Sequence, residues 1–224
     1  MKKKQSEKTA AGRWENFWYY YKYHVLVILL VALALAVTLR DCATRVEPDV
    51  QLKAILSTHA TVDMTEAVEA KLVDAGVVPD INGDGKQDAF LQVITLPEQI
   101  KSEQDMMAQQ QVMLALAEGA SVIYLTDAST LDEYGDQEIF EDMSGIAQQY
   151  GLSREQIYVD EETGDAVGIS LAGNTLLGEC GFDTESMYLS TVARHLDHIG
   201  DKNADAAYES SLKIIEHLLG CNPK

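Results

Sequence analysis

Residues 50–56, VQLKAIL, have the pattern of a β-strand, because every second side chain from Leu52 is apolar. Just after them, Asp63 and Glu66 have the spacing of a capping box at a helix N-terminus. Apolar residues at helical spacing then continue to Gly76, a residue type that commonly ends helices. This stretch therefore predicts a strand followed by an amphipathic helix, which is the first half of a βαβ unit.

The same alternation continues to residue 125. A second strand is expected at 90–96, FLQVITL, and a third at 122–125, VIYL, whose wholly apolar sequence is typical of burial on both faces. Between them a helix opens at Ser102 and closes at Gly119. We expect its Met-rich face to pack into the core rather than to form a binding groove; the residues expected there are Met106, Met107, Gln110, Met113, Leu114 and Ala117.

Shorter patterns follow in the second half of the chain. Helices are expected at 127–134, 144–150 and 203–219, and strands at 157–159, 166–171 and 187–193. A first half of the βαβαβ type calls for a parallel sheet with right-handed crossovers. The whole pattern predicts a single three-layer α/β lobe with a mostly parallel sheet.

Charge divides the chain into two parts. Residues 1–45 contain eight Lys or Arg and three acidic residues, a net charge of +5, whereas residues 46–224 carry a net charge of −24. Such asymmetry indicates two environments. The formal charge of the whole chain, −19, argues against nucleic acid as a partner, because binding to phosphates needs a basic face.

Residues 24–39, HVLVILLVALALAVTL, contain no acidic residue, Lys or Arg. Seven aromatic residues lie in the ten positions before them. Aromatic side chains of this kind are typical of the headgroup level of a bilayer. We expect one transmembrane helix over 24–39, beginning as early as Tyr19, because a span needs about 20 residues. A cleaved signal peptide is the alternative, since Ala34 and Ala36 have the spacing recognised by signal peptidase.

The basic residues lie mainly before this span, which predicts a cytoplasmic N-terminus. The expected organisation is a basic and aromatic cytoplasmic segment at 1–23, the span at 24–39, a linker at 40–49 and an extracellular α/β domain at 50–224. The chain is therefore expected to be a single-pass protein of the cell membrane with its C-terminal domain outside the cell.

Residues 80–88, DINGDGKQD, are similar to the first part of a calcium loop. Side-chain oxygens occur at its first, third, fifth and ninth positions, and a glycine at the sixth allows the chain to curl. The expected ligands are Asp80, Asn82, Asp84, the backbone carbonyl of Lys86, and Asp88. Leu91 stands where such loops have a bidentate Glu, so weak calcium binding is expected, and a polar turn without an ion is the alternative.

The remaining polar groups give no pattern of catalysis. His195 and His198 could share a helix face and bind zinc, but no third ligand is identifiable, and an exposed polar pair is the favoured interpretation. The acidic residues of 160–165 are interpreted as a solvated hairpin turn. Cys180 and Cys221 either pair in an oxidising compartment or remain free thiols.

Four stretches carry a resemblance to a known family: the strand and helix of 50–76, AEGASVIYLTD at 117–127, IFEDMS at 139–144, and VGISL at 167–171 with the strand and helix that follow. Through them, residues 50–219 resemble the extracellular solute-binding proteins of ABC transporters, which have the type-2 periplasmic-binding fold. The resemblance implies a parallel α/β lobe whose strand order reverses near its ligand cleft. Such proteins have two lobes, whereas the 179 residues after residue 45 suffice for one.

These observations predict a membrane-anchored, non-enzymatic binding module that meets a protein partner or a small ligand. Two alternatives remain. One is the substrate-binding component of an ABC-type uptake system, and the other is an enzyme whose site the sequence motifs do not reveal.

Overall fold

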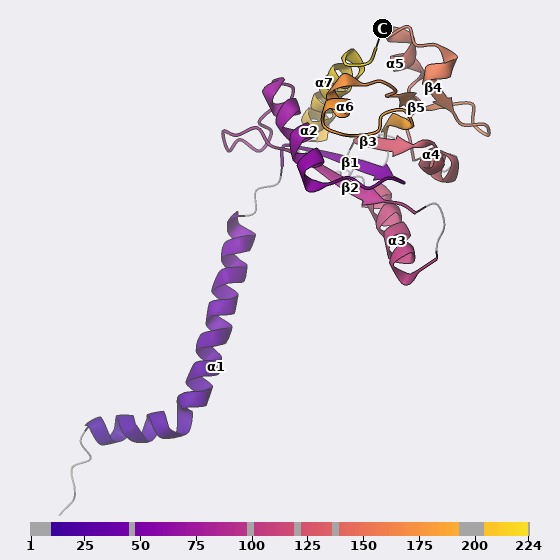
Figure 1. The fold of residues 1–224 in the computed structure, drawn as a ribbon. Coiled ribbons are helices and arrows are strands. Elements are labelled where there is room, and N and C mark those ends of the chain that lie inside the picture. Colours follow the sequence, from indigo (N-terminus) through magenta and orange to yellow (C-terminus); the bar gives the residue numbers. More distant parts are fainter. Residues whose placement is uncertain are drawn as a thin grey trace, which may run out of the picture. The chain divides into compact units, whose positions relative to one another are not determined.

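The structure, a computed structural model, describes residues 10–44, 48–97, 101–118, 122–135, 139–192 and 204–223. The chain divides into two compact units, Met1–Glu47 and Pro48–Lys224. Figure 1 shows the long helix of the first unit and the sheet with its helices in the second.

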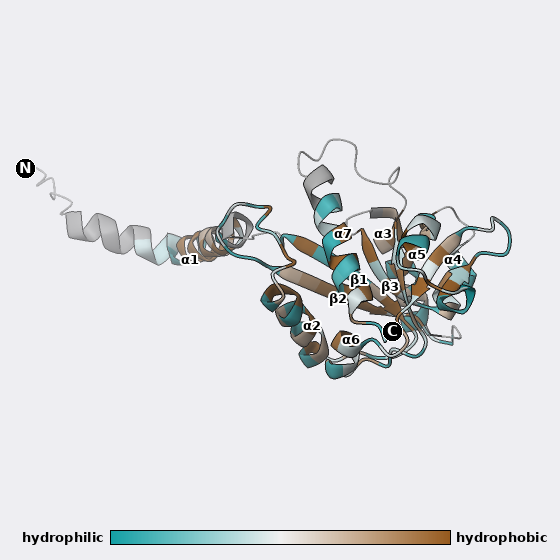
Figure 2. Cartoon of the chain, turned by 90° about the horizontal axis from the view of Figure 1, so that it is seen from above, coloured by the Kyte–Doolittle hydropathy of each residue, from teal (hydrophilic) through white to brown (hydrophobic). Residues whose placement is uncertain are grey.

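The described part of the first unit is one helix, α1 (Ala10–Thr44). Its segment Trp18–Arg40 has 23 residues and contains an 18-residue window with a mean hydropathy of 2.2 in which no residue is buried, so it is long and apolar enough to cross a membrane. Figure 2 shows the hydrophobic character of this helix. The segment begins before residue 24, and α1 includes residues 40–44, which were expected in the linker; no Pro or Gly interrupts the helix there.

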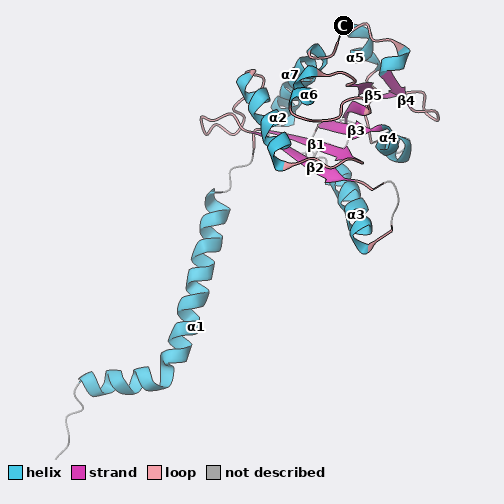
Figure 3. Ribbon diagram, in the orientation of Figure 1, coloured by secondary structure: helices cyan, strands magenta, loops and turns pink. Residues whose placement is uncertain are grey.

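Within the described residues, the second unit contains a six-stranded sheet in the order β2-β1-β3-β6-β5-β4 (Figure 3). The strands are β1 (Val50–Leu56), β2 (Ala89–Thr95), β3 (Ile123–Asp127), β4 (Ile157–Val159), β5 (Ala166–Ser170) and β6 (Met187–Thr191). All six were expected from the sequence, with ends that differ by up to two residues. The α/β class is therefore confirmed.

The sheet is mixed. β1 pairs in parallel with β2 and with β3, and the other three described pairs, β3–β6, β6–β5 and β5–β4, are antiparallel. β1, β2, β3 and β5 thus run in one direction and β4 and β6 in the other, so the expected mostly parallel sheet is found only in this loose sense. The short acidic turn between β4 and β5 explains part of the difference, because a hairpin joins antiparallel strands.

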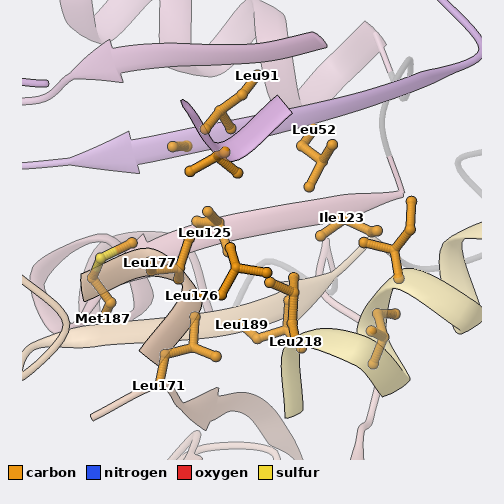
Figure 4. Packing of buried hydrophobic residues seen from close by; sticks show 14 of the residues in the cluster. Leu52, Leu91, Ile123, Leu125, Leu171, Leu176, Leu177, Met187, Leu189 and Leu218 are labelled. Atoms are coloured by element: carbon orange, nitrogen blue, oxygen red, sulfur yellow. The ribbon is translucent and has the colours of Figure 1, made fainter. Parts of the chain in front are cut away.

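Helices cover both faces of the sheet, which gives three layers. Side chains such as Leu52 point to one face and pack with α2 (Val62–Asp74), α6 (Thr175–Glu179) and α7 (Ala204–Gly220). Figure 4 shows this core, with Leu125 and Leu189 from the sheet near Leu177 and Leu218 from the helices. We call this side the α2 face.

The opposite side, which we call the α3 face, carries α3 (Glu103–Glu118) and α4 (Ala128–Tyr134). Its core includes Ile55 of β1, Tyr124 of β3 and Leu116 of α3. Two shorter helical segments, α5 (Ser144–Gln149) and η2 (Arg154–Gln156), precede β4.

Local side chains determine where several helices start. Thr61, not Asp63, is the N-cap of α2, and Asp63 lies in the first turn, where its charge complements the helix dipole. Asn174 caps α6, a short helix that was not expected, by accepting a hydrogen bond from the Leu177 amide. Gly76 adopts a φ of 69° just after α2, as its role in ending the helix requires.

The orientation of α3 differs from the expectation. Its buried side consists of Val112, Ala115 and Leu116. The face expected in the core lies outward, and each of its members is exposed: Met106, Met107, Gln110, Met113, Leu114 and Ala117. The expectation was wrong because α3 has apolar residues on two sides, and the side with fewer and smaller residues packs on the sheet.

Candidate functional site

The strand order locates a candidate site at the carboxyl ends of β1 and β3. From β1 the chain passes through α2 on one face to β2, and then returns through α3 on the other face to β3. β1 therefore lies between its two successors, and the strand order reverses beside it. Ligands of open α/β sheets bind at the carboxyl ends of strands at such a switch point.

Asp127, the last residue of β3, organises this position. One of its carboxylate oxygens, Oδ2, accepts a hydrogen bond from the backbone amide of Ser57, directly after β1, at 2.6 Å. The other, Oδ1, accepts hydrogen bonds from the Ser129 hydroxyl at 2.8 Å and from the Thr130 amide at 2.9 Å and hydroxyl at 2.8 Å. The carboxylate thus joins the end of β1 to the first turn of α4.

These contacts also set the charge state of Asp127. Burial raises the pKa of this carboxyl, but the hydrogen bonds from Ser129, Thr130 and Ser57 outweigh burial, so the pKa lies below its ordinary value. Asp127 is therefore ionised at neutral pH. Its described partners are amides and hydroxyls, an arrangement that suits a structural carboxylate better than a general base.

Further polar groups lie on the neighbouring strand ends. After β1, His59 is exposed, and its Nδ1 lies 3.4 Å from the Thr95 hydroxyl at the end of β2. After β3, Ser129 is exposed as well. The imidazole of His59 and the hydroxyls of Thr95 and Ser129, at three adjacent strand ends, can hydrogen-bond a polar ligand.

This site was not predicted from the sequence, although the sequence contains a signal for it. Polar residues follow the apolar strand β1 at Ser57, Thr58 and His59, and Asp127 follows the apolar part of β3. Polar side chains directly after buried strands mark the carboxyl edge of a sheet. Only the strand order shows which of these ends are neighbours.

The expected calcium loop, residues 80–88, is an exposed and tightly curled turn. Both oxygens of Asp80 accept backbone hydrogen bonds, from Gly83 at 2.7 Å and Gly85 at 3.0 Å. Asn82 and Asp84 each accept one from the amide two residues further on. Gly83 and Gly85 have φ values of 75° and 83°, a conformation that favours glycine.

A residue outside the motif anchors this loop. Asp49, which was expected in the linker, is buried and accepts hydrogen bonds from the amides of Ile81 at 2.7 Å, Asn82 at 3.0 Å and Asp88 at 3.0 Å. Across the described ranges, no group of three or more His, Cys, Asp or Glu side chains is placed to hold a metal ion. Calcium binding by Asp80, Asn82, Asp84, Lys86 and Asp88 stays a prediction.

The other predicted groups do not join the switch point. Cys180 is buried and Cys221 half-buried, and both are free thiols in the structure; burial raises the pKa of Cys180. Asp160 accepts hydrogen bonds from the amides of Glu162 and Thr163, so 160–165 form the expected turn, but Asp160 itself is buried and not solvated as expected. His195 and His198 lie outside the described residues.

The chain was compared with models of known protein families and with curated proteins, and neither comparison gave a match. The assignment of this site therefore depends on the strand order and on the contacts of Asp127. What these define is a mixed α/β domain with a polar switch point at the ends of β1 and β3.

Proposed function

We propose that this chain is a membrane-anchored, non-enzymatic binding module whose outer domain acts as one lobe of the solute-binding type. The observation that carries the proposal is the reversal of strand order beside β1, with exposed polar residues at the adjacent strand ends. The ligand class that suits hydroxyl and imidazole groups is a small polar solute or a peptide.

Binding is favoured over catalysis by the way Asp127 is used. Its hydrogen bonds to Ser57, Ser129 and Thr130 fix the strand ends and hold the carboxylate in its ionised form. A general base works best with a pKa near the operating pH, whereas the pKa of Asp127 is lowered. Such rigid strand ends would present the neighbouring polar groups to a ligand in a fixed arrangement.

The binding proposal is tested with the full chain in a neutral detergent. Melting temperature is measured with a panel of free amino acids, dipeptides and neutral sugars, for the parent chain and for Ser129→Leu. A solute that raises the melting temperature of the parent, but not of Ser129→Leu, supports the site. The matched control is Ser153→Leu, an exposed serine beside β4 at the far end of the sheet. No response to any solute would overturn the proposed ligand class.

The proposed location is the cell membrane, with Trp18–Arg40 as an uncleaved anchor and the second unit outside the cell. The excess of basic residues before the span over those that closely follow it supports this orientation. A reporter fused after Lys224 is expected to work only outside the cell, and the mature chain to retain its N-terminal segment in mass spectrometry. Reporter activity in the cytoplasm would overturn the orientation, and a chain shortened after residue 36 would show a signal peptide.

A narrower proposal concerns the loop of residues 80–88 as a weak structural calcium site. Its four acidic or amide side chains are all exposed on a turn curled by Gly83 and Gly85. Calorimetric titration with Ca²⁺ is expected to give heat that disappears in Asp84→Ala. The control is Asp183→Ala, another exposed acidic residue in a loop. Without heat, the loop is an ordinary polar turn.

A further inference from the structure

An apolar stripe runs along the outward side of α3. Its large members are Met106, Met107, Met113 and Leu114, whose exposed fractions are 50%, 57%, 52% and 59%. Gln110 and Ala117 lie on the same side of the helix and are exposed too. We call these six residues the α3 stripe.

The α3 stripe is one continuous surface. Successive residues of a helix are separated by about 100°, so the six positions fall within an arc of about 120°. The side that packs on the sheet is separate and consists of Val112, Ala115 and Leu116, in the C-terminal half of the helix. Figure 1 shows the rest of α3 projecting beyond the β2 edge of the sheet.

The residues of the α3 stripe are exposed in the folded chain, and yet all but Gln110 are apolar. Single exposed apolar residues are ordinary, but a contiguous exposed patch marks a surface that contacts another molecule. Methionine is the side chain that adapts most readily to a partner's shape, because it is unbranched and polarisable. Three of the four large members of the α3 stripe are methionines.

Acidic residues predominate in the segment that carries this surface. Residues 101–135, which include α3 and α4, contain six acidic residues, of which Asp127 is buried, and one basic residue, Lys101. Glu103 and Asp105 lie in the first turn of α3, and a hydrogen bond of 3.1 Å from Gln109 Nε2 to Glu133 places an acid of α4 beside it. Together with the net charge of −24 for residues 46–224, this repels both anionic lipid and a second copy of the chain.

We infer that the α3 stripe is a docking surface for a basic amphipathic helix of a partner protein. Such a helix would lay apolar residues spaced three or four apart on the methionines. It would direct Lys or Arg toward the acidic residues of α3 and α4 such as Glu103 and Glu133, which we call the acidic rim. The inference deepens the proposed binding function, on which it rests, by naming one partner class. It concerns a different surface from the switch point, so the two can fail separately.

The test is site-specific photo-cross-linking with the full chain in its native membranes. A benzophenone amino acid replaces Met107 in the α3 stripe or, as the matched control, Val62, which is 70% exposed on α2. The expected result is an adduct at position 107, absent at position 62, whose cross-linked peptide in mass spectrometry is net basic and has apolar residues at helical spacing. The added Leu114→Glu substitution is expected to lower the yield about tenfold, because it places an unpaired charge under the partner.

The second measurement changes the charge of Glu103 and again determines the cross-linking yield. Glu103→Lys is expected to lower the yield severalfold and Glu103→Asp to leave it unchanged, because only the first reverses the charge on the rim. An adduct with a second copy, with lipid, or with a segment that is not basic would overturn the inference, as would a yield at position 107 no higher than at position 62. Any of these results together with an outward reporter and a solute response would overturn the partner and leave the proposed binding function standing.

Discussion

The two faces of the sheet are built differently. In the described residues, the α2 face has a core of 23 buried residues, whereas the core of the α3 face has 12. The outward side of α2 carries acidic residues such as Asp63, Glu66 and Asp74, but the outward side of α3 carries the α3 stripe. Packing on the sheet accounts for the one apolar side of α2. In contrast, α3 has a second apolar side that the sheet does not cover.

The largest difference is expected between leucines on the two sides of α3. Leu116→Ala, on the sheet side, is expected to reduce the free energy of unfolding by about 3 kcal/mol, because it removes buried methyl groups and leaves a cavity. Leu72→Ala on α2 is expected to cost a similar amount. Urea unfolding of the fragment Pro48–Lys224, followed by circular dichroism, measures both.

The control for this comparison is Leu114→Ala, which is expected to change the free energy of unfolding by less than about 0.5 kcal/mol because the side chain is exposed. If Leu114→Ala cost as much as Leu116→Ala, both sides of α3 would be packed within the chain. The contrast between the two faces would then be lost.

Gly168 tests how closely the α3 face is packed. A Cβ at this position of β5 would lie 2.7 Å from Leu131 Cδ1 of α4 and 3.3 Å from the Cβ atoms of Tyr158 and Tyr188. Gly168→Ala is therefore expected to lower the free energy of unfolding by about 2 kcal/mol through overpacking. Gly178→Ala in α6 is the control, because a Cβ there meets nothing within 4 Å. An equal effect of both substitutions would show that β5 and α4 separate easily.

Asp127 links the two faces, since it joins β1 to α4 at the switch point. Asp127→Asn is expected to lower the free energy of unfolding by about 1–2 kcal/mol at pH 7, because an amide cannot accept all of the present hydrogen bonds. The folded-state pKa of Asp127 lies below the unfolded value, so its stabilisation is present above about pH 4 and is lost as the pH falls through the folded pKa. Unfolding between pH 7 and pH 2.5 measures this.

The pH dependence of stability is compared between Asp127→Asn and the parent chain. Asp127→Asn is expected to lose less stability on acidification than the parent chain, because the substituted side chain does not titrate. Parallel pH profiles for the two chains would show that the strand ends are held by something other than the ionised carboxylate.

The sequence was sufficient to predict which segments of the chain form strands. The alternation in VQLKAIL and the apolar run before Asp127 reflect burial in the sheet, which depends on local pattern. The side on which α3 packs was not predictable in the same way. Periodicity identifies an apolar stripe, but when a helix has two, only the shape of the sheet determines which is buried.

The contacts at the sites depended on tertiary structure. Asp49 looked like a linker residue, yet it holds a loop more than 30 positions further along the chain. Ser57 and Asp127 are 70 positions apart and meet only because β1 and β3 are neighbours. Local motifs such as 80–88 are visible in a sequence, whereas a switch point is a property of strand order.

The smallest expected effect on stability belongs to the α3 stripe itself. Leu114→Glu is expected to change the free energy of unfolding by less than about 0.5 kcal/mol, because a half-exposed side chain leaves its new charge in water. The same charge on the sheet side, as Leu116→Glu, is expected to prevent folding, because it would be buried without a partner. Thermal unfolding monitored by circular dichroism distinguishes the two. A large loss in Leu114→Glu would mean that this side chain is covered by the chain's own residues, and the α3 stripe would then belong to the core.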